Sequence, residues 1–167
     1  MRQIVHNPVQ PLDMARHPAL RPVFIAQGTL APGRPSRKML VSRQHAFLSC
    51  GGGLRGVIGR ANALIRARHI TEVLNRAQMR TGGRLPVHYF HLLFDRHEII
   101  RVDHVWAESF FAGPGGLAAH SEIGATLRLA TQPMQRARPL LSRSELRPVA
   151  TAQPTRHQAS LALALAH

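Results

Sequence analysis

Residues 87–111 read VHYFHLLFDRHEIIRVDHVWAESFF, and they carry the strongest β signal in the sequence. The stretch is dense in aromatic and β-branched residues, the composition typical of strands. A polar cluster at 95–98 (DRHE) interrupts the pattern, and we expect either a hairpin or a bulge there. The dipeptide at 103–104 (DH) predicts the next turn, and VWA at 105–107 begins the last strand. The stretch therefore predicts a mostly β domain whose best-packed part lies here.

Weaker signals precede this stretch. VFI at 23–25 predicts a short strand that ends at Gly28, and a second apolar run begins with MLV at 39–41 and continues into AFL at 46–48. Residues 57–80 are ambiguous, because alternation over 63–69 favours a strand whereas the spacing over 70–77 is helical. We expect a strand followed by a short helical turn.

The length of 167 residues suits one domain with a modest core. We divide the chain into an irregular, proline-punctuated lead-in over 1–16, a β domain over 17–116, an extension of that domain over 117–146, and a flexible tail over 147–167. The C-terminal part is expected to be short helix or irregular chain. No run of about 18 apolar residues is present, and the first residues lack an apolar leader, so neither a membrane span nor a signal peptide is expected.

The net charge of +14 leaves two interpretations open. Arginine suits phosphate, so a surface that binds nucleic acid or another polyanion is one of them. The other is codon bias in a GC-rich genome, because Lys38 is the single lysine and the arginines are scattered along the chain. Cys50 is the single cysteine, which excludes an internal disulfide and a thiolate zinc cluster. The 11 histidines show no metal-ligand spacing, so neither a metal nor a cofactor is expected.

Two short motifs carry candidate chemistry. Ser42 and His45 are three residues apart, so a hydroxyl and an imidazole could bracket one carbonyl or amide group, the first donating a hydrogen bond and the second moving a proton. Asp95 and His97 are two residues apart, which places them on one face of an extended chain, where the carboxylate could orient His97 or another imidazole. A structural accident at the first motif and a solvated turn at the second are the plain alternatives.

Several strings in this order resemble the bacterial Hint (hedgehog/intein) domain family. They are HPALRPVFI with GTLAPGRPSRKMLVSRQHAFL, then LIRARHI, then VHYFHLLFDRHEII with VWAESFFAGP, and finally ARPLLSRSEL at 137–146. HLLFDRHE followed by WAESF is the most specific element, and the similarity runs from about His17 to Leu146. The resemblance implies a mostly β, horseshoe-like fold and a cysteine-dependent N–S acyl shift that converts a backbone amide into a thioester.

The resemblance also implies roles for the candidate residues. Ser42 and His45 match the family's Thr/Ser-x-x-His motif, which polarises the scissile bond and protonates its leaving nitrogen. Asp95 and His97 match a later acid/histidine block that assists proton transfer. His69 also matches a family position, without a role that we can assign.

The sequence departs from the family pattern in three places. The cysteine-led opening strands that precede HP-x-LRPV in the family are not found before His17, and Cys50 follows the Ser-x-x-His motif, so it cannot replace the opening nucleophile. Arg43 stands where the family usually has proline, and no His-Asn pair ends the domain, which points to the hedgehog type. We therefore expect an N-terminally truncated, incomplete Hint-type β fold, unable to self-cleave alone.

Three hypotheses follow about what the chain does. The first is the truncated autoprocessing domain itself, located in the bacterial cytoplasm or exported within a larger protein. The second is one half of a split domain that acts in trans with an N-terminal Hint segment or a flanking domain. The third is a basic module that binds nucleic acid or other polyanions; a membrane is not an expected partner.

Overall fold

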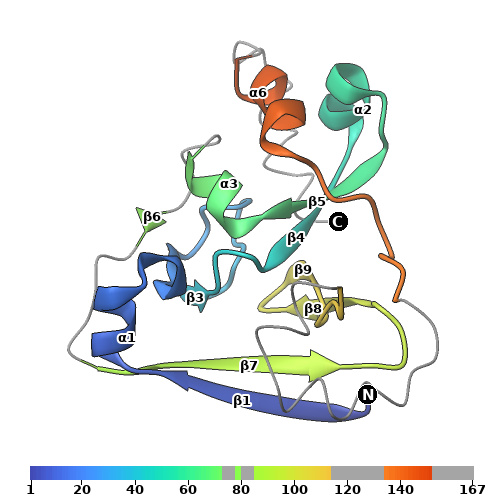
Figure 1. Ribbon diagram of the computed structural model, residues 1–167. Coiled ribbons are helices and arrows are strands. Elements are labelled where there is room, and N and C mark those ends of the chain that lie inside the picture. Colours follow the sequence, from blue (N-terminus) through green and yellow to red (C-terminus); the bar gives the residue numbers. More distant parts are fainter. Residues whose placement is uncertain (73–77, 80–84, 114–133, 152–167) are drawn as a thin grey trace.

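The computed structural model describes residues 1–72, 78–79, 85–113 and 134–151 (Figure 1). These residues form a mostly β structure, which confirms the predicted fold class. Antiparallel pairing joins the strands into small sheets with the orders β1–β7, β3–β2–β6 and β5–β4–β9–β8. The strands are β1 (Gln3–Val9), β2 (Val23–Ile25), β3 (Met39–Val41), β4 (Ala46–Cys50), β5 (Asn62–Arg66), β6 (Gln78–Met79), β7 (Val87–Leu93), β8 (Ile99–Val102) and β9 (Val105–Glu108).

Short helices connect and flank the sheets. They are α1 (Pro11–Arg16), the 3-10 turn η1 (Pro18–Leu20), α2 (Gly52–Ile58), α3 (Ala67–Glu72) and α6 (Arg143–Thr151). In Figure 1, α2 and α6 lie beside each other at one end, away from the β1–β7 ribbon. None of the helices in the described parts of the chain is long and apolar enough to cross a membrane.

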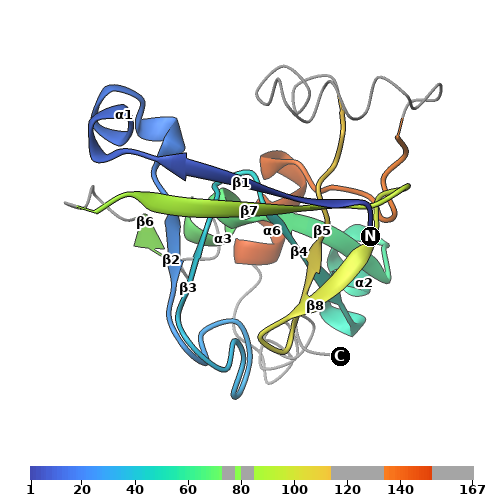
Figure 2. The same ribbon diagram turned by 90° about the horizontal axis from the view of Figure 1, so that it is seen from below.

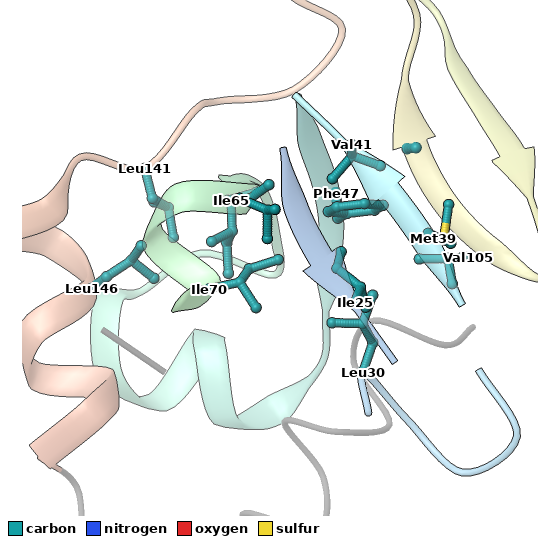
Figure 3. Packing of buried hydrophobic residues seen from close by; sticks show 14 of the residues in the cluster. Ile25, Leu30, Met39, Val41, Phe47, Ile65, Ile70, Val105, Leu141 and Leu146 are labelled. Carbon is teal, nitrogen blue, oxygen red and sulfur yellow. The ribbon is translucent and has the colours of Figure 1, made fainter. Parts of the chain in front are cut away.

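The main core lies between the three-stranded and four-stranded sheets and the C-terminal helix. Figure 3 shows Phe47 of β4 beside Val41 and Val105 beside Met39, with Leu141 and Leu146 approaching Ile65 from the C-terminal segment. The side chains of Phe47, Leu141 and Leu146 are fully buried. Burial of this kind contributes roughly 1.5–3 kcal/mol for each large apolar side chain, so the C-terminal segment is an integral part of the fold.

The predicted strand at 23–25 and the predicted turn at 103–104 are both confirmed. Asp103 and His104 have φ values of 47° and 65°, and they link β8 to β9 as a two-residue hairpin. Positive φ at both central residues is the pattern whose twist matches that of paired strands. Within the ambiguous segment, strand β5 is followed directly by α3, so the helical turn begins at Ala67, within the alternating residues. Residues 73–77 and 80 of this segment lie outside the described residues.

The hairpin expected at 95–98 is wrong. β7 pairs with β1, through a register that sets Gln3 opposite Leu93 and Val9 opposite Val87, whereas β8 pairs with β9. The polar residues at 95–98 therefore carry the chain from one sheet to another. Figures 1 and 2 both show β1 and β7 side by side as a long ribbon across one side of the molecule.

The irregular structure expected for residues 1–16 is also wrong. Residues 3–9 form β1, because Val5 and Val9 alternate with exposed neighbours and are buried on the inner face of the ribbon. Pro8 is tolerated because β1 is an edge strand. Residues 11–16 then form α1.

The flexible tail expected over 147–167 is wrong for its first residues. Residues 147–151 complete α6, and Val149 is buried in the main core. Residues 117–133 of the predicted extension and residues 152–167 of the predicted tail lie outside the described residues. The boundaries of the four predicted regions stay predictions.

Candidate functional site

The turn between β3 and β4 holds the first predicted motif. The His45 amide donates a hydrogen bond to the Ser42 carbonyl (3.2 Å), and the Gln44 amide donates to Ser42 Oγ (3.1 Å). A hydroxyl has one donor and two acceptor positions, so Ser42 Oγ keeps its own proton to donate. The motif is therefore a tight, locally bonded turn that presents a hydroxyl and an imidazole from one short segment.

Arg43 and the backbone tie this turn to α3. Arg43 Nη2 lies 3.2 Å from Glu72 Oε1, and the Arg43 carbonyl accepts a hydrogen bond from the Arg68 amide (3.2 Å). The His45 carbonyl accepts another from the Ala67 amide (2.8 Å). The residue that stands in place of the family's usual proline thus holds the turn through an ion pair.

Glu108, at the end of β9, forms the centre of the candidate site. Only 8% of its surface is exposed, and its Oε2 lies 3.1 Å from His97 Nε2 and 2.9 Å from Arg136 Nη1. His97, just before β8, is also buried. The β8–β9 hairpin brings the two together, because Ile99 is paired with Glu108 and the adjacent Glu98 carbonyl accepts the Ser109 amide at 2.9 Å.

His45 belongs to the same group through its interaction with Glu108. Phe47 pairs with Ala107 across β4 and β9, so the residues just before β4 lie beside the end of β9. Burial lowers the pKa of the His45 ring, and the negative charge of Glu108 opposes this by raising it. The ring also contacts Phe47 edge-on, with the centroids 5.2 Å apart.

The pKa of Glu108 reflects competing causes. Burial raises it, but the hydrogen bond from His97 and the nearby guanidinium of Arg136 lower it, and the net effect places the pKa below its ordinary value. Glu108 is therefore a carboxylate at neutral pH. His45 is neutral there, because the pKa of its ring is lowered from 6.5. The site thus combines a neutral imidazole with a nearby buried anion.

Asp95 is not part of this group. Its side chain is 68% exposed and forms an ion pair with Arg2, at the end of the β1–β7 ribbon. The expectation that Asp95 orients His97 is wrong in the structure, because the chain bends between them and places one outside and the other inside. Glu108 takes the position beside His97.

Replacing Asp95 with asparagine should change little. The Arg2–Asp95 pair is exposed, and such pairs contribute at most about 1 kcal/mol to the free energy of unfolding. We expect the Asp95→Asn chain to unfold in urea within that margin of the wild type. A loss of several kcal/mol would show that this carboxylate has a structural role that its exposure does not suggest.

Sequence reasoning missed Glu108 and Arg136. A signal for Glu108 was present, because it is the single charged residue in the mostly apolar VWAESFF string. Its pairing with Ile99 across the hairpin appears only in the structure. Arg136 had no comparable signal. His69, the other family position, is buried on α3, and its Nδ1 has no hydrogen-bond partner among the residues that the structure describes. No group of three or more metal-ligating side chains lies together in the described part of the molecule.

Comparison with known proteins gives one match. A family model described as Hint domain matches residues 1–114. Neither the curated proteins nor the solved structures give a match. The matched range includes β1, the Ser42–His45 turn and the β8–β9 hairpin, and it ends before Arg136.

Proposed function

The chain belongs to the Hint domain family, and from that premise we propose that it supplies the proton-transfer groups of an autoprocessing site whose cysteine nucleophile comes from a segment outside this sequence. The observation that carries the proposal is the buried Glu108, which binds His97 and lies at the end of β9, beside the turn that holds His45. A neutral imidazole beside a buried carboxylate is suited to move a proton at neutral pH.

The N–S acyl shift requires one proton transfer. The thiol sulfur attacks the preceding carbonyl carbon, the S–C bond forms, the C–N bond breaks, and the thiol proton ends on the released amine. His45, which is neutral, is suited to accept that proton and deliver it to the leaving nitrogen. The Ser42 hydroxyl, which keeps its proton, is suited to donate a hydrogen bond to the carbonyl oxygen as negative charge develops there.

Cys50 is poorly placed to be the nucleophile. It lies five residues beyond His45 along β4, which corresponds to roughly 16 Å at the rise of an extended strand. Side chains at odd and even positions of a strand point to opposite faces, so Cys50 is also not on the face that His45 shares. Burial raises the pKa of the Cys50 thiol, with Arg138 partly opposing it, so the reactive thiolate is disfavoured.

The test is to place a cysteine-led N-terminal segment from another Hint protein ahead of Met1, with a reporter domain ahead of that cysteine. Hydroxylamine attacks a thioester and should release the reporter from this fusion, while the chain alone should keep its mass of 18.4 kDa. Changing the added cysteine to serine should abolish release, and Cys50→Ser should leave it unchanged.

Three results would contradict the proposal. One is cleavage of the unfused chain, and another is loss of release in the Cys50→Ser fusion. The third is absence of release from a fusion that unfolds cooperatively, as followed by the fluorescence of Trp106. The last result would show that a folded chain with an added nucleophile lacks the expected proton-transfer groups.

A further inference from the structure

Residues 134–142 cross the candidate site before the chain enters α6, and we refer to them as the C-terminal strap (Figure 1, orange). The strap is fixed at both ends. Met134 Sδ accepts a hydrogen bond from the Ala112 amide (3.4 Å), and Leu64 of β5 donates to the Pro139 carbonyl (2.7 Å) and accepts from the Leu141 amide (2.9 Å). Leu141 is fully buried in the main core. The strap is therefore a built-in part of the site, although it lies beyond the residues that the family model matches.

The Ala137 amide determines which nitrogen of His97 carries the proton. It donates to His97 Nδ1 at 3.0 Å, and a backbone N–H can only donate. Nδ1 must therefore be unprotonated, so the proton of the neutral ring is on Nε2, where it is donated to Glu108 Oε2. Each ring nitrogen of His97 is therefore engaged within the site, Nδ1 by the Ala137 amide and Nε2 by Glu108.

Arg136 is the second side chain that binds Glu108. Its guanidinium donates to the same Oε2 that accepts the proton of His97, and it lies 3.7 Å above the Phe111 ring. The edge of Phe111 contacts His97, with the centroids 5.3 Å apart. Phe111 thus contacts both His97 and Arg136. The adjacent strap residues 136 and 137 bind the two members of the His97–Glu108 pair.

We propose that the C-terminal strap is a positioning element of the site: Arg136 and the Ala137 amide lock His97 as a proton donor to an ionised Glu108, so that His45 alone moves the proton. This inference rests on the proposed function for the role of His45. The fixed tautomer of His97 is a property of the unfused chain and does not depend on that role. It also revises the role that the family resemblance implies for His97, which becomes a fixed donor that holds the carboxylate in place.

The lock is tested by histidine NMR on the full chain labelled with ¹⁵N in histidine. At neutral pH we expect His97 to show an unprotonated, hydrogen-bonded Nδ1 and a protonated Nε2. Ala137→Pro removes the amide proton and should give His97 a mixture of both tautomers, whereas Ala137→Gly keeps the amide and should restore the wild-type spectrum. A protonated Nδ1 in the wild type, or an unchanged tautomer in Ala137→Pro, would overturn the lock.

The consequence for the reaction is tested in the cysteine-led fusion. Arg136→Gln should slow hydroxylamine-dependent release about tenfold or more, the usual effect of losing a hydrogen bond to a charged group, and Arg136→Lys should recover part of the rate. Arg101→Gln is the charge-matched control. It removes an exposed arginine from the four-stranded sheet that carries Glu108, and this fusion should release its reporter at the wild-type rate. Equal rates for the two glutamine variants would overturn the positioning role. A fusion that never releases its reporter contradicts the proposed function. The positioning of His97 is still tested separately, by the tautomer that NMR finds for His97 in the unfused chain.

Discussion

Replacing Glu108 with alanine is expected to lower the free energy of unfolding by about 3 kcal/mol. The substitution leaves the buried N–H of His97 and the guanidinium of Arg136 without their shared acceptor. Breaking a buried ion pair by removing one partner costs about 3–5 kcal/mol, and the lower end applies because a quarter of the Arg136 side chain is exposed. Urea unfolding followed by Trp106 fluorescence measures the difference.

Glu108→Gln is the matched control for this variant. The amide oxygen still accepts the hydrogen bond from His97, so we expect the loss to be smaller, about 1–2 kcal/mol. If alanine and glutamine were equally destabilising, the hydrogen bond to His97 would have no energetic role. If neither were destabilising, the buried network would not hold the fold.

The stabilising effect of Glu108 should depend on pH in a defined direction. The folded-state pKa of Glu108 is lowered below its ordinary value of 4.5, so the folded protein prefers the ionised form. The resulting stabilisation is fully present above pH 4.5 and is lost as the pH falls through the folded-state pKa. The difference in the free energy of unfolding between the wild type and Glu108→Gln should therefore become smaller below pH 4.5.

The second large effect is expected at His45. In the cysteine-led fusion, His45→Ala should slow reporter release on the order of 100-fold or more, the usual contribution of a positioned proton-transfer group. His17→Ala, which removes an exposed histidine at the end of α1, is the matched control and should leave the rate unchanged. A His45→Ala fusion that folds normally and releases at the wild-type rate would remove His45 from the mechanism.

The pH dependence of the release rate is a second test of the role of His45. Release needs neutral His45, and burial lowers the pKa of this ring from 6.5, so the rate should stay level as the pH falls to 6.5 and decline only below it. The charge of Glu108 raises the pKa of His45, so Glu108→Gln should move the decline to still lower pH. A decline centred above pH 6.5 would be inconsistent with this environment.

Local sequence patterns predicted the parts of the fold that depend on near neighbours. The strand at 23–25 and the turn at 103–104 are set by residues that lie within a few positions of one another. The partner of β7 could not be predicted in this way, because β1 lies some eighty residues earlier, and alternation reveals which face is buried without revealing which strand pairs with it. The structure of residues 1–16 was missed for that reason.

In the candidate site too, residues that are close in sequence could be predicted, and residues brought together by tertiary structure could not. The spacing of Ser42 and His45 predicted a hydroxyl and an imidazole close to each other, and the structure places both residues on one turn. The acid beside His97 was sought two residues away, at Asp95, whereas the fold brings it from the far strand of a hairpin, at Glu108. Arg136 and Ala137 come from a segment about forty residues downstream of His97, and only tertiary structure reveals them.

We propose that this chain holds the proton-transfer groups of a reaction whose nucleophile comes from elsewhere. The decisive experiment is mass spectrometry of the reporter that hydroxylamine releases from the cysteine-led fusion. We predict a C-terminal hydroxamate on the reporter, formed at the same rate in the wild type and in Cys50→Ser, and on the order of 100-fold more slowly in His45→Ala. A hydroxamate formed equally fast without His45, or lost when Cys50 is replaced, would contradict the claim.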